Sequence, residues 1–183
     1  MGLTEQTVIS QQVYFYRDAG YSPLIAAVFY GVFGICLATG NLLGSFSDRI
    51  GRDRLALPCF ILCLGFACLL FRMKDTSTPW LPPLFAVGFG VSFGTLSCVL
   101  NATVADIFHG PNYGKIAGVI TLGFAIGGCI SPWLAGYLYD ITGGHTASYI
   151  VVVASMIASI VMYLILAPRK VRHPHFRHHH APA

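Results

Sequence analysis

Long runs without a charged residue constrain this chain more than any other feature. Six runs free of Asp, Glu, Lys and Arg contain 11, 29, 17, 30, 24 and 28 residues, at 6–16, 19–47, 55–71, 76–105, 116–139 and 141–168. A helix needs roughly 20 apolar residues to cross the hydrocarbon core of a bilayer. The last five runs therefore predict five complete membrane-spanning helices. The first run predicts a truncated helix, because extending it to Met1 would bring Glu5 into the membrane.

Composition agrees with an all-α membrane protein. The chain is 55% hydrophobic and 10% charged, with a mean hydropathy of +0.68. We expect residues 1–168 to form one transmembrane unit in contact with the lipid bilayer. Residues 169–183 form a basic, histidine-rich tail that we expect to be disordered, because it has almost no apolar side chains to bury.

The basic residues predict the orientation of the chain, since cytoplasmic loops carry an excess of Lys and Arg. Alternate connections give three basic residues on one side, Arg17, Arg72 and Lys74. The other side receives eight, namely Arg49, Arg52, Arg54, Lys115, Arg169, Lys170, Arg172 and Arg177. The loop around residue 50 and the C-terminus are therefore expected in the cytoplasm, with the plasma (inner) membrane as the expected location.

Several function classes are disfavoured. The net charge of +4 comes from basic residues at the ends of the apolar runs, not from a stripe that would bind nucleic acid. An enzyme within the membrane would need paired carboxylates or histidines, and we expect no Asp, Glu or His deep in a span. We also expect no cofactor and no metal, because no Cys or carboxylate accompanies the histidines of the tail.

One loop between two apolar runs has a motif with a physical logic, Gly44-x3-Asp48-Arg49-x-Gly51-Arg52. Gly44 allows a neighbouring helix to approach closely, and Gly51 permits a tight turn. Asp48 lies at the helix end, and the arginines hold the loop at the cytoplasmic face. We call residues 44–52 the signature loop.

The signature loop resembles that of the major facilitator superfamily of secondary transporters, although Asp53 stands where the family usually has a basic residue. The segments 105–118 and 136–143 resemble its monocarboxylate and oxalate–formate branch. The resemblance implies that this chain is the C-terminal half of a twelve-helix transporter. It also implies that Asp48 acts as a gate latch against the opposite half.

An internal repeat supports the same fold. The pattern Gly44-x3-Asp48-x2-Gly51 recurs 92 residues later as Gly136-x3-Asp140-x2-Gly143, with Thr142 inside the second copy. By the predicted orientation, the first copy ends in the cytoplasm and the second ends outside. This opposite orientation is typical of an inverted three-plus-three repeat.

Polar residues within the apolar runs are candidates for a substrate cavity. In the run 76–105, Ala86, Gly90, Gly94, Ser97 and Asn101 follow helical spacing; Gly90 and Gly94 suit helix packing, and the two polar residues suit a cavity. The other candidates are Gln12, Tyr14 and Asn41, the last at a position where transporters of small organic acids often have Arg. Pro132 should kink its helix.

The expected function is therefore alternating-access transport of a small organic solute, with an organic anion as one option. A half-transporter needs a complementary N-terminal six-helix half or a second copy of itself to complete the cavity. The alternative is a truncated membrane fragment that does not transport.

Overall fold

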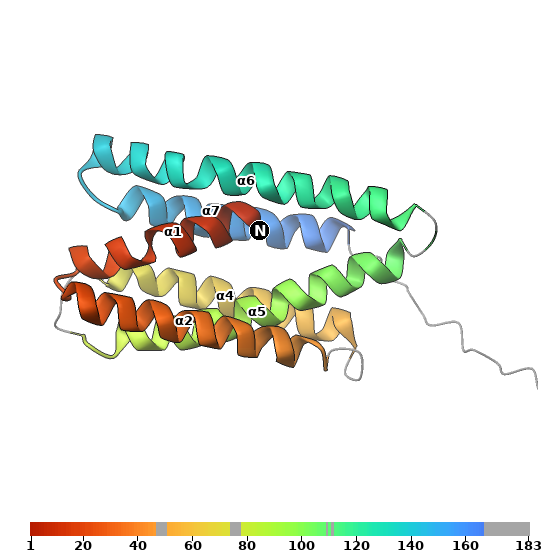
Figure 1. Ribbon diagram of the computed structural model, residues 1–183, viewed down its shortest axis with the longest axis horizontal. Helices are drawn as coiled ribbons and strands as arrows, with labels where there is room; N and C mark the ends of the chain where they lie inside the picture. The colour runs from red at the N-terminus through yellow and green to blue at the C-terminus, as the bar shows by residue number, and fades with distance from the viewer. Residues whose placement is uncertain (47–50, 74–77, 109, 111, 167–183) are drawn as a thin grey trace, which may run out of the picture.

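The computed structural model describes residues 1–46, 51–73, 78–108, 110 and 112–166, except for the side chain of Asp53. These residues form a bundle of helices without a strand (Figure 1). The helices are α1 (Gly2–Asp18), α2 (Pro23–Gly44), α4 (Arg52–Leu69), α5 (Leu81–Ile107), α6 (Tyr113–Thr142) and α7 (Thr146–Leu166). A short 3₁₀ helix, η1 (Leu70–Arg72), extends α4.

The five predicted spans are confirmed in number and place. Among the described residues, α2, α4 with η1, α5, α6 and α7 are long and apolar enough to cross a membrane. The first helix has 17 residues and is not among these candidates. It begins earlier than expected, at Gly2, because the amide of Glu5 already bonds to the carbonyl of Met1. Glu5 is therefore part of a helix that was expected to start after it.

Glycines bring α2 and α5 into close contact. A Cβ added to Gly90 would lie 3.0 Å from the Cβ of Cys36 on α2, and one added to Gly44 would lie 2.5 Å from the Cβ of Cys98 on α5. At Gly40 the hydroxyl of Thr95 donates to the glycine carbonyl at 3.0 Å. The packing role predicted for Gly44, Gly90 and Gly94 is confirmed, and Gly40 packs in the same way, because in each case backbone atoms of the other helix lie within 3.0 Å of where a Cβ would be.

Hydroxyl groups join α1 to α6 and α7. The Oγ atoms of Thr7 and Ser131 lie 2.5 Å apart, and those of Thr4 and Ser155 lie 2.6 Å apart. Ser131 also donates to the carbonyl of Leu3 at 3.2 Å. In a membrane such bonds contribute only about 0.6 kcal/mol each on average, because the same hydroxyls also find partners when the helices are apart. They fix α1 on the α6–α7 pair.

The helix pairings are compatible with the predicted inverted repeat. Contact is most extensive between α2 and α5, and α5 also packs on α4, while α1 packs on α6 and α7. If α1, α2 and α4 are matched in order with α5, α6 and α7, the pair α2–α5 corresponds to α6–α1, and the pair α4–α5 corresponds to α7–α1. The repeat itself stays a prediction.

Candidate functional site

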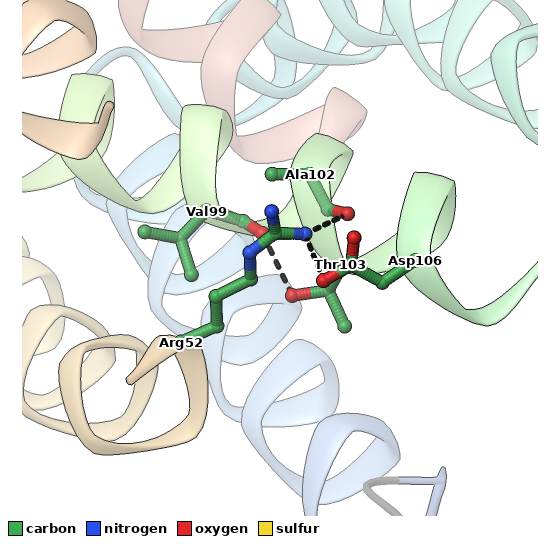
Figure 2. A network of polar contacts seen from close by, with 5 residues as sticks. All are labelled: Arg52, Val99, Ala102, Thr103 and Asp106. Carbon is green, nitrogen blue, oxygen red and sulfur yellow. Dashed lines mark hydrogen bonds and ion pairs between the residues drawn. The ribbon is translucent and has the colours of Figure 1, made fainter. Parts of the chain in front are cut away.

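The described part of the signature loop is held against the end of α5. Figure 2 shows the side chain of Arg52, at the start of α4, reaching the C-terminal turns of α5. Its guanidinium donates to the carbonyl of Ala102 and pairs with the carboxylate of Asp106. The side chain of Asp106 is 61% exposed, so the ion pair lies at the bundle surface. Arg52 thus ties the start of α4 to α5. The role predicted for the arginines at the cytoplasmic face stays a prediction.

Gly51 provides the turn. Its φ angle of +101° lies in a region that side-chain-bearing residues rarely adopt, which agrees with the turn predicted for this glycine. Asp48 and Arg49 lie outside the described residues. Their roles in the signature loop stay predictions.

A cavity of about 560 Å³ opens among α1, α5, α6 and α7. Ser97 and Asn101, both predicted to face a substrate, line it together. The rest of the wall is largely apolar, with Phe93, Leu100, Val104, Ile107, Ile120 and Phe124. Figure 1 shows α1 beginning part of the way along the bundle, so that α5 and α6 extend past its first residue. A mostly apolar cavity with a few polar groups is the usual form of a small-molecule site.

Glu5 also lines this cavity, and the sequence reasoning did not select it. It is the only acidic or basic side chain among the lining residues that the structure describes. Glu5 was not a cavity candidate, because its charge marks the end of the apolar run that begins at Gln6.

Gln12 and Tyr14 lie on different faces of α1. Gln12 is fully buried, and its amide donates to the hydroxyl of Tyr16 at 2.7 Å. The side chain of Tyr14 is 55% exposed. Two residues apart on a helix means a turn of about 200°, so they cannot line one surface. Neither lines the cavity that contains Ser97 and Asn101.

Asn41 is half-buried at the contact of α2 with α5, away from this cavity. Its amide donates to the carbonyl of Leu37 at 3.2 Å, one turn earlier in the same helix. The backbone nitrogen of Asn41 would lie 3.0 Å from a Cβ added to Gly94. The surroundings of Asn41 in this chain are therefore those of a helix contact.

The second copy of the motif resembles the first at its turn but not in its packing. Gly143 ends α6 with a φ angle of +66°, and Gly51 at the equivalent position also has a positive φ. Thr142 donates to the carbonyls of Leu138 and Gly144 at 2.7 and 3.0 Å. Asp140 is exposed, and a Cβ added to Gly136 would meet no atom within 4 Å, unlike one at Gly44.

Pro132 lies inside α6, which continues through it as one helix from Tyr113 to Thr142. The neighbouring Ser131 faces α1 and is buried. Figure 1 shows α6 without a sharp break, and the kink predicted at Pro132 stays a prediction.

In the described ranges, no group of three or more His, Cys, Asp and Glu residues could hold a metal ion. All six cysteines are free, and they belong to the helices.

Comparison with known proteins places this chain among transporters. A profile described as Major Facilitator Superfamily matches residues 2–182. Monocarboxylate transporter 13 from Rattus norvegicus is 27% identical over 162 residues, which are 87% of this chain and 36% of that protein. Monocarboxylate transporter 12 from Xenopus laevis is 30% identical over 143 residues, 76% of this chain and 31% of that protein.

A shorter match has higher identity. Monocarboxylate transporter 2 from Homo sapiens is 35% identical over 82 residues, which cover 45% of this chain and 17% of that protein. No solved structure gives a significant match. The chain spans about a third of the length of the first curated relatives that it matches.

Proposed function

Because this chain belongs to the major facilitator superfamily, we propose that it is the C-terminal half of a secondary transporter that moves a small organic solute by alternating access. The chain is an integral, multi-pass membrane protein of a family of solute transporters. In such proteins one half rocks on the other around a site near the middle of the membrane. A complementary half, from a six-helix partner or a second copy, completes the transporter.

The cavity lined by Ser97 and Asn101 carries this proposal. It joins the hydrogen-bonding side chains of Ser97, Asn101, Thr103 and Thr121 to a largely apolar wall, which suits a small solute with a polar end and an apolar body. The residues come from α1, α5, α6 and α7, so the cavity draws on both halves of the predicted repeat. A change in the packing of these helices would alter the cavity directly.

The relatives favour a small monocarboxylate as the solute, since their names describe them as monocarboxylate transporters. This half offers such an anion hydrogen bonds from Ser97 and Asn101, whereas Glu5 repels it when ionised. The complementary half therefore supplies the cation that balances the solute charge.

The signature loop serves as the gate latch at the cytoplasmic end. Arg52 fixes the end of the loop to Ala102 and Asp106 on α5. Asp48 then interacts with a helix end of the opposite half and steadies the outward-open state. We place this loop and the C-terminus in the cytoplasm and the protein in the plasma membrane, on the distribution of basic residues.

The test uses the chain assembled with the six N-terminal helices of a matching monocarboxylate transporter. Asn101→Ala should raise the apparent KM for labelled lactate roughly two- to tenfold, the value of one lost hydrogen bond. Ser97→Ala should act in the same direction. The matched control is Asn112→Ala, which changes an exposed asparagine just before α6. Unchanged uptake kinetics in both cavity variants would remove this site.

A further inference from the structure

His145 occupies an unusual position for a residue in a turn. It lies between α6 and α7, yet its side chain is only 6% exposed. The rings of Phe15, Tyr139 and Tyr149 surround the imidazole, with centroid distances of 4.8, 4.6 and 6.4 Å. Three helices thus meet at one histidine.

The imidazole is paired on one side. Its Nε2 atom lies 3.1 Å from Oδ2 of Asp18, the last residue of α1. Its Nδ1 atom is buried and has no hydrogen-bond partner among the described residues. The neutral ring can donate from Nε2 to the carboxylate, and Nδ1 then needs no acceptor.

Protonation changes this balance, because Nδ1 would gain a buried N–H without an acceptor. Burial lowers the pKa of His145 from its ordinary value, and the carboxylate of Asp18 opposes this shift without reversing it. The titratable groups that face the ring are Asp18 from α1, Tyr139 from α6 and Tyr149 from α7. Asp18 is the only carboxylate among these groups.

We propose that Asp18 and His145 form a pH-sensitive clasp, which holds the last turn of α1 against the turn between α6 and α7 and opens when His145 takes up a proton. In the open state His145 is solvated, with an ordinary pKa of about 6.5. Since the closed state has the lower pKa, the clasp is fully stable above that value and weakens as the pH falls below it. The population of the open state can rise at most about tenfold for each unit by which the pH falls.

The clasp would make the position of the last turn of α1 depend on the pH at the membrane face where that turn lies. By the predicted orientation, this end faces outside. External acid would then free the last turn of α1, which begins the connection to α2. The inference concerns the clasp alone and does not depend on the identity of the solute.

Hydrogen–deuterium exchange on the whole chain in lipid nanodiscs tests the clasp. Exchange in peptides covering residues 13–22 and 143–150 is measured at pH 7.5 and 5.5 and corrected for the intrinsic rate. The corrected exchange should rise about three- to tenfold at the lower pH. His145→Gln, which retains a donor near the position of Nε2, should abolish this rise.

Two further variants keep the test decisive if His145→Gln fails to fold. Asp18→Asn should increase exchange at both pH values, because the neutral ring loses its charged acceptor. Asp140→Asn is the matched control, as it removes an exposed carboxylate near the same end of α6. A wild-type chain without a pH response, or a response that persists in His145→Gln, would overturn the proposal.

Discussion

Replacing Gly40 by alanine should force α2 away from α5, whereas the same change at Gly34 should not. A Cβ at Gly40 would collide with the carbonyl oxygen of Val91 and lie 3.0 Å from the amide of Thr95. Gly34 is six residues earlier in the same helix, and a Cβ there meets no atom within 4 Å. The two variants add the same methyl group to the same helix.

The magnitudes follow from these surroundings. Forcing a methyl group into a packed contact costs about 1–3 kcal/mol. Separation of the helices also weakens the bond from the Thr95 hydroxyl to the Gly40 carbonyl, about 0.6 kcal/mol for a hydrogen bond in a membrane. Alanine favours a helix interior by roughly 0.5–1 kcal/mol over glycine. Gly40→Ala should therefore destabilise the chain by about 1–3 kcal/mol, and Gly34→Ala should be neutral or slightly stabilising.

The assay is reversible unfolding of the purified chain in mixed micelles, with the free energy of unfolding compared among the three proteins. The native thiols of Cys36 and Cys98, both half-buried, lie at the same helix contact and provide a local readout. Both should react faster with a maleimide in Gly40→Ala. Equal stabilities of Gly40→Ala and Gly34→Ala would refute the close packing of α2 on α5.

Three other substitutions test the site. Arg52→Gln should lower the free energy of unfolding by about 0.2–1 kcal/mol, as expected for a surface ion pair, and an equal loss in Arg54→Gln would show that only the charge matters. Glu5→Gln should lower the apparent KM for lactate in the assembled transporter by removing a like charge from the cavity, and a higher KM would show that Glu5 helps to bind the solute. Asp48→Asn should leave the unfolding of the isolated chain nearly unchanged but shift the assembled transporter several-fold towards inward-open, as an interaction of about 0.3–2 kcal/mol allows. Labelling of a cysteine in the outer cavity measures that shift, and equal loss of folded protein in the two preparations would make Asp48 a local cap.

The spans were predictable because membrane insertion depends on length and polarity, which a sequence states directly. For example, α2 ends at Gly44, shortly before the next charged residue in the sequence, Asp48, and α4 begins at Arg52. The start of α1 was not predictable on this basis. Glu5 joins the helix and lines the cavity of Ser97 and Asn101, so its charge did not mark a helix end.

The packing of individual glycines could be predicted only in part. Gly40 and Gly34 belong to the same helix, yet only Gly40 meets another backbone. That difference depends on where the helices cross, which single residues do not specify. The bonds from Thr4 and Thr7 to α7 and α6 were missed for the same reason, since hydroxyls occur throughout the apolar runs. By contrast, helical geometry alone could have shown that Gln12 and Tyr14 face different ways.

Solute uptake tests most directly the central claim, which is that this chain is one half of a transporter. The chain is reconstituted in liposomes alone, and together with the six N-terminal helices of a matching monocarboxylate transporter, and uptake of labelled lactate is followed in each. The account predicts uptake above empty liposomes when both halves are present, weakened by Asn101→Ala. The chain alone should show uptake only if it forms a dimer that chemical crosslinking detects. Well-folded, co-purifying halves that take up no lactate or other small monocarboxylate would contradict it.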